Sequence, residues 1–177
     1  MENKVYLRAF EPDDYKTIIK WRKDDEIGIM LGGTKYFFSE ENEKAWVLNA
    51  IKDTTNIKLA ICTTNDIHIG NVYITDIDFI NRSCHSHILI GEKEYWNGGY
   101  ATEAMRIIID FMFKERGMNR IVANALDYNH ASIRMLEKCG YKIEGILRQS
   151  VYKNGRYNNQ VVMSLLKEDY DNARVKE

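Results

Sequence analysis

A glycine-bearing turn in the middle of the chain has the residue types that bind phosphate. Residues 94–104 read Glu-Tyr-Trp-Asn-Gly-Gly-Tyr-Ala-Thr-Glu-Ala and connect an apolar strand pattern directly to a long helix pattern. The first turn of a helix has backbone N–H groups without intrahelical partners and carries the positive end of the helix dipole, and glycine lets an anion approach the backbone. The turn could therefore hold a pyrophosphate; a plain strand-to-helix turn is the alternative.

Two familiar nucleotide-binding motifs are missing from this turn. It has no Gly-Lys-Ser/Thr that would place a lysine and a magnesium ligand on phosphates. It also lacks the three-glycine spacing, followed by a ribose-binding acid, of a dinucleotide site. The elements around the turn must therefore decide which phosphate-bearing molecule it suits.

Composition predicts one domain that spans residues 1–177. With 45% hydrophobic residues, the chain has enough apolar material for one buried core. Its 25 basic and 26 acidic residues give a net charge of −1, and no basic block stands out that would neutralise nucleic acid. The sequence has neither a signal-peptide pattern nor about 18 consecutive apolar residues. We therefore expect a cytoplasmic protein with no nucleic acid partner and no membrane association.

The cysteines indicate a reducing compartment. Cys62, Cys84 and Cys139 are odd in number and far apart in the sequence. This spacing suits neither a disulfide framework nor a Cys-x-x-Cys metal site. We interpret them as small buried hydrophobes and predict no metal site.

The first third of the chain reads as strand, helix, loop and helix. Residues 5–10 alternate as in a strand, and Pro12 can open a helix at its first position. Residues 24–26 are acidic and read as the solvated end of that helix, before a glycine loop at 32–33. Ser39 is typical of an N-cap and predicts a second helix after it.

The middle of the chain changes to the period of strands. Residues 58–63 and 68–78 are rich in β-branched and aromatic residues and predict an antiparallel hairpin. A third sheet segment is expected over residues 82–91. After the glycine turn, residues 100–116 predict the longest helix, which Gly117 ends.

The last third predicts a strand, a short helix and a hairpin. Residues 120–126 read as a buried strand, and Asn129 can cap a short helix that Gly140 ends. Residues 141–152 and 160–166 read as strands joined around Asn154-Gly155, a strong hairpin signal.

This order of elements resembles the GNAT superfamily of N-acetyltransferases across essentially the whole chain. Residues 95–104 look like its acetyl-CoA pyrophosphate loop, Asn129 with Ser132 looks like its Asn-x-x-Ser, and residues 137–141 look like its Glu-Lys-x-Gly-aromatic close. The tail is similar to the branch of ribosomal-protein N-terminal and spermidine acetyltransferases. The resemblance implies a mixed α+β fold with a central twisted, mostly antiparallel sheet, a splayed parallel strand pair and flanking helices.

The resemblance also implies that acetyl-CoA is the co-substrate. The strand before the glycine turn would splay away from its parallel neighbour and hydrogen-bond the pantetheine amides, a role that falls to Ile88, Leu89 and Ile90. Asn129 would reach the pantetheine arm from the other wall of the cleft. The groups expected to hold the pyrophosphate are those of Asn97, Gly98, Gly99, Tyr100, Ala101 and Thr102.

The implied reaction is aminolysis of a thioester. A primary amine loses a proton and attacks the acetyl carbonyl, and a backbone N–H near Leu89 could stabilise the oxyanion. The leaving thiolate must then be protonated. In the branch most like this chain the inward serine is the usual candidate for that step, which makes Ser132 the candidate acid or thiolate-orienting donor. A structural helix serine that bonds the backbone is the alternative.

Two positions depart from the pattern of many relatives. Ser86 stands where they carry a glutamate general base, and Leu136 stands where they carry a tyrosine acid. We therefore take His87 as the candidate base, with His85 beside it, because histidine is readily poised near neutral pH. Ordinary packed or surface histidines are the alternative. Other side chains on neighbouring strands that could reach the acceptor are Tyr73, Tyr152 and Glu144.

Two classes of function are compatible with these residues. The leading hypothesis is an acetyl-CoA-dependent N-acetyltransferase whose acceptor is a small-molecule or peptide amine: a protein N-terminus, a polyamine or an amino sugar. The other is an acyl-CoA sensor that kept the cleft and lost the chemistry. Residues 11–53 contain ten acidic and seven basic residues, which mildly favours a cationic acceptor or simply indicates a solvated surface. Because relatives are commonly dimers, a homodimer is also expected.

Overall fold

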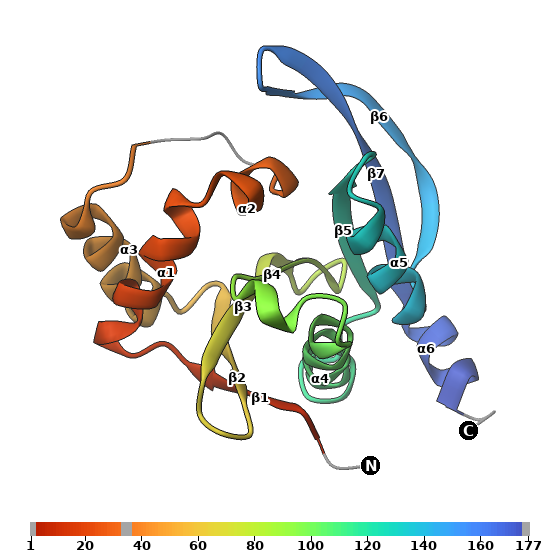
Figure 1. Ribbon diagram of the computed structural model, residues 1–177. Helices are drawn as coiled ribbons and strands as arrows, with labels where there is room; N and C mark the ends of the chain where they lie inside the picture. The colour runs from red at the N-terminus through yellow and green to blue at the C-terminus, as the bar shows by residue number, and fades with distance from the viewer. Residues whose placement is uncertain (1–2, 33–36, 175–177) are drawn as a thin grey trace.

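A computed structural model describes residues 3–32 and 37–174 of the chain (Figure 1). The strands of this part form one seven-stranded sheet in the order β1-β2-β3-β4-β5-β7-β6. The strands are β1 (Val5–Ala9), β2 (Ile57–Thr63), β3 (His68–Asp78), β4 (Ser83–Ile90), β5 (Arg120–Leu126), β6 (Lys142–Lys153) and β7 (Arg156–Leu166). The helices are α1 (Tyr15–Lys23), α2 (Asp25–Met30), α3 (Glu40–Lys52), α4 (Tyr100–Lys114), α5 (His130–Lys138) and α6 (Lys167–Arg174), with short 3₁₀ turns at Pro12–Asp14 and Lys93–Tyr95.

The sheet is antiparallel except for the β4–β5 pair. These two parallel strands are in register only from Ser83 to His85 of β4, and β4 continues alone to Ile90. The structure therefore confirms the mostly antiparallel sheet with a splayed parallel pair, flanked by helices.

Two separate apolar clusters hold helices on the two faces of the sheet. The larger one packs α4 and α5 against the sheet and includes fully buried Met105, Ile108 and Met112 of α4. The smaller one packs α1 and α3 on the other face through Ile18, Trp21 and their neighbours. In Figure 1, α1, α2 and α3 lie on the opposite side of the sheet from α4, and the β6–β7 hairpin rises above both groups. Of the helices that the structure describes, none has the length and apolarity to cross a membrane.

Most boundaries agree with the local signals of the sequence. Ser39 caps α3 by accepting from the Asn42 N–H at 3.1 Å, and the β6–β7 turn has its two central residues, Asn154 and Gly155, at positive φ as predicted. Gly117 has a φ of 63° after α4, and Gly140 has a φ of 92° after α5. These positive φ values are the reason that glycine occupies both helix ends.

Three local predictions differ from the structure. Helix α1 ends at the acidic residues 24–26 as predicted, with Asp24 as its C-cap, but a loop does not follow. The Asp24 side chain accepts from the N–H groups of Glu26 and Ile27 and so opens α2. β7 begins at Arg156, four residues earlier than expected. The chain also ends in a helix, α6, that was not predicted. Gly33 of the expected glycine loop lies outside the described residues.

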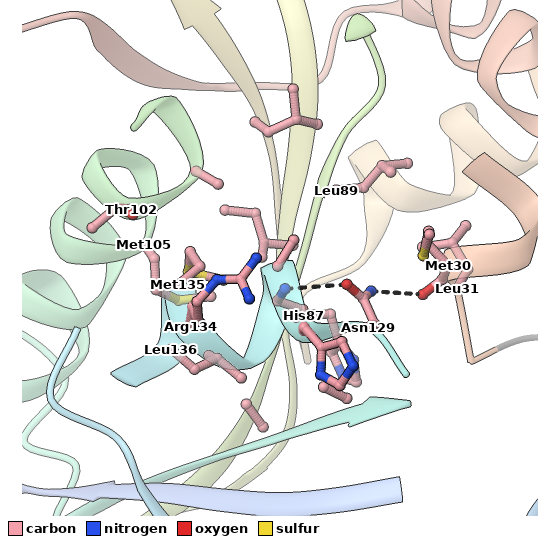
Figure 2. Close-up of a pocket in the computed structure, with 18 of the residues that line it drawn as sticks. Met30, Leu31, His87, Leu89, Thr102, Met105, Asn129, Arg134, Met135 and Leu136 are labelled. Carbon is pink, nitrogen blue, oxygen red and sulfur yellow. Dashed lines mark hydrogen bonds between the residues drawn. The ribbon is translucent and has the colours of Figure 1, made fainter. Parts of the chain in front are cut away.

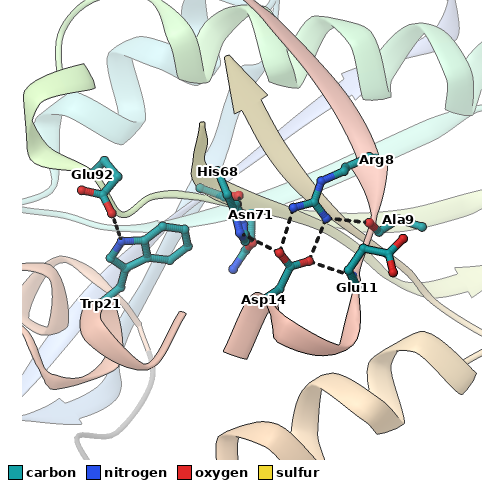
Figure 3. A network of polar contacts seen from close by, with 9 residues as sticks. Arg8, Ala9, Glu11, Asp14, Trp21, His68, Asn71 and Glu92 are labelled. Carbon is teal, nitrogen blue, oxygen red and sulfur yellow. Dashed lines mark hydrogen bonds and ion pairs between the residues drawn. The ribbon is translucent and has the colours of Figure 1, made fainter. Parts of the chain in front are cut away.

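A buried polar network fixes α1 to the sheet (Figure 3). The Asp14 carboxylate is 7% exposed and accepts two hydrogen bonds of 2.8 Å from the Arg8 guanidinium of β1. It also accepts from the Glu11 N–H and lies 3.2 Å from Nδ1 of His68, at the start of β3. Burial alone would raise the pKa of Asp14, but the Arg8 and His68 contacts outweigh it and hold this pKa well below its usual range.

The same region ties α1 to the end of β4. The Trp21 indole N–H donates to the Glu92 carboxylate at 2.9 Å (Figure 3). A Cβ on Gly91 would lie 2.0 Å from the Trp21 ring, so only glycine allows this approach. Helix α1 is therefore positioned by direct contact with the residues that follow β4, the strand predicted to bind the pantetheine.

Replacing Asp14 with asparagine should lower the free energy of unfolding by about 3 kcal/mol, because it leaves Arg8 and His68 facing a neutral group in a buried network. Urea denaturation at pH 7 measures the change. Asp13→Asn is the matched control: Asp13 is exposed and forms a surface pair with Lys16, so this change should cost less than about 0.5 kcal/mol.

The difference between wild type and Asp14→Asn should also depend on pH. Asp14 has a lowered pKa in the folded state, so its contribution is full above the unfolded value of about 3.9 and is lost as pH falls through the folded value. The two proteins should therefore converge in stability on acidification. A difference that stays constant down to acid pH would contradict this role.

Candidate active site

A cavity of about 540 Å³ lies where β4 separates from β5. One wall is the glycine turn with the start of α4, and the opposite wall is α5. The end of α2 and one residue of β7, Gln160, close the far side. The cavity that the separation of β4 from β5 opens is thus bounded by the glycine turn, α4, α5 and α2.

The backbone of β4 presents unpaired groups to this cavity. The Gly91 N–H donates to the Ile69 carbonyl at 2.8 Å, so the Gly70–Ile90 pair belongs to the non-hydrogen-bonded type of the antiparallel ladder. The alternation then directs the backbone groups of Leu89 to β3, and those of Ile88 and Ile90 toward the side that β5 has left. The Ile90 carbonyl accepts from the Trp96 indole N–H at 2.8 Å, so the groups left for a ligand are those of Ile88 and the N–H of Ile90. The predicted backbone donor near Leu89 is therefore offered by Ile88 or Ile90. Leu89 itself lines the cavity.

The glycine turn opens α4 without a side-chain cap. Asn97 and Gly99 both have positive φ, of 59° and 85°, and Gly99 is the residue before the first turn. Within the described part of the chain, no side chain bonds to the amides that open the helix. Tyr100, Ala101 and Thr102 supply these first-turn amides, and all three residues line the cavity. An anion in the cavity would meet free N–H donors and the positive end of the α4 dipole.

Gly98 has a different role from its neighbour. It is not among the residues that line the cavity, and its carbonyl accepts from Lys4 Nζ at 3.0 Å. A Cβ on Gly98 would lie 2.8 Å from the Tyr100 ring, which packs edge-on against Tyr95. The structure therefore indicates that Gly98 allows the turn to pack, and any contact with a ligand stays a prediction.

Three cations near the glycine turn were missed in the sequence. Arg134 and Lys138 of α5 line the cavity, and Lys4 bonds the turn itself. Figure 2 shows the Arg134 guanidinium in the space between α5 and α4. Arg134 and Lys138 lie one helical turn apart, at i and i+4, which is the only signal in the sequence that places them on one face. Together with the α4 dipole they make this end of the cavity suitable for phosphate.

Asn129 joins two walls of the cavity (Figure 2). Its carbonyl oxygen accepts from the Ser132 N–H at 3.1 Å and caps α5, as predicted from the sequence. Its amide group donates to the carbonyl of Met30 in α2 at 3.0 Å. Both polar ends of this side chain are therefore engaged, and the second N–H of the amide group is the donor left for the predicted contact with a pantetheine arm.

His87 lies in the cavity wall with a defined hydrogen-bond chain behind it. Its Nε2 is 3.0 Å from the Thr75 hydroxyl, and that hydroxyl donates to the Asp76 carboxylate at 2.9 Å. Because the hydroxyl proton is used toward Asp76, the hydroxyl oxygen accepts from Nε2–H. These two hydrogen bonds therefore select the neutral tautomer of His87 in which Nε2 carries the proton and Nδ1 is a proton acceptor.

The surroundings of His87 lower its pKa. Its side chain reaches solvent through the cavity, yet the cavity walls displace water around it, and this desolvation is the main cause of the lowered pKa. The neighbouring His85 lowers the pKa of His87 further, whereas Asp76 raises it. The ring is thus neutral at pH 7 and able to accept a proton. Figure 2 shows the ring near Asn129, on the side of the cavity toward α2.

Ser132 and Leu136 lie one helical turn apart on the inner face of α5, and both line the cavity. The Ser132 backbone is held by the Asn129 cap, while its hydroxyl is available in the half-buried wall. Ser86, in place of the glutamate of many relatives, bonds the buried Tyr141 hydroxyl at 2.9 Å. Ser86 is therefore a packing residue rather than a free base.

The other candidates from neighbouring strands are engaged elsewhere. Glu144 pairs with Arg120 and accepts from Ser164 at 2.6 Å. Tyr152 packs its ring against Tyr157 of the same hairpin. Tyr73 packs in the apolar cluster of α1 and α3.

Most of the site residues predicted from the sequence lie together. Eleven of the twelve line the same cavity, and Gly98 adjoins it. The donor set suits acetyl-CoA, since free amides and cations occupy one end, an unpaired strand edge the middle, and a neutral histidine the other end. Among the described residues, no group of three or more His, Cys, Asp or Glu side chains is placed to hold a metal ion.

The splayed strands, the uncapped helix N-terminus and the cavity between them are the arrangement of an acetyltransferase. The sequence matches the family model described as acetyltransferase (GNAT) domain over residues 4–142. This chain therefore belongs to the GNAT acetyltransferase family, as the motifs predicted.

Relatives of similar length are named as N-acetyltransferases. The chain is 24% identical over 168 residues to the uncharacterized N-acetyltransferase YnaD of Bacillus subtilis, covering 95% of this chain and 96% of the relative. It is 26% identical to YokL, a prophage-derived uncharacterized N-acetyltransferase of the same organism, covering 93% and 91%. The predicted enzyme class, an N-acetyltransferase, is thereby confirmed.

The fold is similar to that of a solved polyamine acetyltransferase. A spermidine N-acetyltransferase from Vibrio cholerae, in complex with CoA and spermine, superposes with a TM-score of 0.87 at 24% identity. The match covers 96% of this chain and 99% of that one. At 24% sequence identity, this similarity shows that the two proteins share a fold.

Replacing Gly99 with aspartate should weaken CoA binding by at least about 100-fold. A carboxylate at the start of α4 would lie beside the phosphates, and like charges about 4 Å apart repel by roughly 4 kcal/mol near a protein surface. Lys4 Nζ, 3.9 Å from a Cβ placed on Gly99, would offset part of this repulsion, and 100-fold needs only ~2.7 kcal/mol. Titration calorimetry with CoA measures the change.

The matched control is Gly117→Asp at the other end of α4. Gly117 also has a positive φ, of 63°, and no atom lies within 4 Å of a Cβ placed there. This variant carries the same charge and similar backbone strain, so it should keep wild-type affinity. Equal loss in both variants, or none in either, would contradict a phosphate site at Gly99.

Proposed function

We propose that the protein transfers the acetyl group of acetyl-CoA to a primary amine by direct attack in a ternary complex. One observation carries the proposal: the uncapped N-terminus of α4 and the unpaired edge of β4 line the same cavity. The first suits the pyrophosphate and the second suits the pantetheine amides. Spermidine acetyltransferase neighbours support a small amine as the acceptor class. The cytoplasmic location and the homodimer stay predictions from the sequence.

The proposal gives roles to the two walls of the cavity and to the edge of β4. The amides from Asn97 to Thr102, with Arg134 and Lys138, bind the phosphates. Ile88 and Ile90 orient the pantetheine and offer a backbone N–H to the carbonyl oxygen that gains negative charge. Holding the amine and the thioester in line supplies much of the rate.

Proton transfers fall to His87 and Ser132. Nδ1 of His87 accepts the proton that the amine loses, and Thr75 with Asp76 keeps the ring in the required tautomer. The Ser132 hydroxyl donates toward the sulfur that leaves. A structural role for Ser132 at the start of α5 is the alternative, and Ser132→Ala separates the two because only loss of a donor lowers kcat without loss of stability.

Replacing His87 with glutamine should lower kcat by about 100-fold or more and leave the Michaelis constant for acetyl-CoA unchanged, because a general base contributes roughly 10²–10⁴ in rate. Steady-state kinetics at saturating acceptor measure both constants. In the wild type, kcat should fall as pH decreases through the pKa of His87, which lies below the ordinary value of 6.5.

His85→Gln serves as the comparison. It should retain most of the activity and move the acidic limb of the pH profile upward, because it removes a neighbour that lowers the pKa of His87. If kcat of His87→Gln falls with decreasing pH over the same range as in the wild type, His87 is not the base.

The competing function is an acyl-CoA sensor without chemistry, which the absence of the usual glutamate and tyrosine would permit. Thiol release from acetyl-CoA, measured with peptide N-termini, polyamines, amino sugars and simple alkylamines, separates the two functions. The proposed enzyme releases thiol only when a suitable amine is present. A protein that binds CoA in calorimetry and releases thiol with none of these amines would be a sensor.

A further inference from the structure

The described residues that form the part of the cavity beyond Leu89 carry no negative charge. Among the described residues that line the cavity there is no Asp or Glu. The acceptor side is formed by apolar and neutral polar side chains, which are Met30, Leu31, Leu126, Asn124, Tyr128 and Gln160.

The acidic residues of the first third of the chain are placed away from this cavity. Their excess gave the sequence its mild preference for a cationic acceptor, but none of them lines the space. Several are paired with cations of the protein. These pairs are Asp14 with Arg8, Asp24 and Glu26 with Lys93, Glu43 with Arg22, and Asp53 with Lys58.

Carbonyl groups at the end of α2 could also attract an ammonium ion, but they already accept hydrogen bonds from the protein. The carbonyl of Ile29 accepts from the Tyr128 hydroxyl at 2.9 Å. The carbonyl of Met30 accepts from Asn129. The carbonyl of Leu31 accepts from the ammonium group of Lys153. The negative end of this helix is therefore neutralised by the protein itself.

From this arrangement we infer that the acceptor is a primary amine on a molecule that has no second positive charge, with a neutral and partly apolar body. The inference rests on the proposed acetyl transfer. A further ammonium group in this space would lose water and meet no carboxylate among the described lining residues, while the α2 carbonyls there already accept hydrogen bonds, so its burial is costly. Polyamines are thereby disfavoured as acceptors, despite the likeness of the fold to polyamine acetyltransferases.

A matched pair of amines tests the inference. Pentylamine and 1,5-diaminopentane have the same length and present the same alkyl amine, but only the second has another ammonium group. With the wild-type enzyme, thiol release should give a kcat/KM at least about tenfold higher for pentylamine, and spermidine should be as poor as the diamine. Equal or higher values for the diamine would overturn the inference.

A variant then shows where the preference originates. Gln160→Glu introduces a carboxylate into the acceptor wall and keeps an oxygen that can accept from Ser150, as Gln160 does at 3.1 Å. It should raise the diamine-to-monoamine ratio of kcat/KM by about tenfold. Asn65→Asp, in the exposed β2–β3 turn, adds the same charge away from the cavity and should leave the ratio unchanged. An unchanged ratio in Gln160→Glu would count against this wall as the acceptor site.

The amine panel distinguishes a wrong acceptor class from a wrong reaction. If thiol is released and the diamine is preferred, acetyl transfer stands and the neutral acceptor is wrong. If CoA binds and no amine in the panel causes release, acetyl transfer is wrong and the inference falls with it.

Discussion

The divergence of β4 from β5 is the constraint on which the rest of the site depends. The two strands are in register for three residues and then separate, which takes the backbone groups of Ile88 and Ile90 out of the sheet. Buried N–H and C=O groups without partners are costly, so such an edge is stable only where water or a ligand can reach it. The cavity provides that access, and a ligand with amides in an extended chain can complete the sheet there.

The two ends of the cavity differ in charge, and the difference follows from the elements that form them. At one end, the N-terminus of α4 and the cations of α5 favour an anion. At the other end, the carbonyls at the end of α2 accept from Tyr128 and Asn129 of the β5–α5 loop and from Lys153 at the end of β6. The same bonds that hold α2 in place remove the groups that would attract a second cation. Positioning of the wall and choice of acceptor are therefore linked.

Side-chain alternation in the sheet brings the candidate base to the cavity. His87 and Leu89 are two residues apart on β4 and face the same side, toward α2 and away from the α4 core. Thr75 lies on the neighbouring strand, where it can bond Nε2 of His87 and direct Nδ1 outward. The chain thus lacks the glutamate of many relatives and places a histidine, with its own orienting partners, two residues from the strand segment that would bind the pantetheine.

The sequence by itself determined the local features of this protein. The Ser39 and Asn129 caps, the positive-φ glycines and the Asn154-Gly155 hairpin depend on a few neighbouring residues, and the GNAT motifs combine such local signals. The cap that Asp24 gives to α2 is also local, but the acidic run 24–26 was interpreted as a helix end. The sequence did not predict the cations Arg134 and Lys138 in the cavity. It also did not predict the bonds to the end of α2 from Tyr128, Asn129 and Lys153, which join residues about 100 positions apart that only packing of the sheet and helices brings together. The tertiary structure alone therefore decided where the acidic excess lies, and so the charge that an acceptor meets.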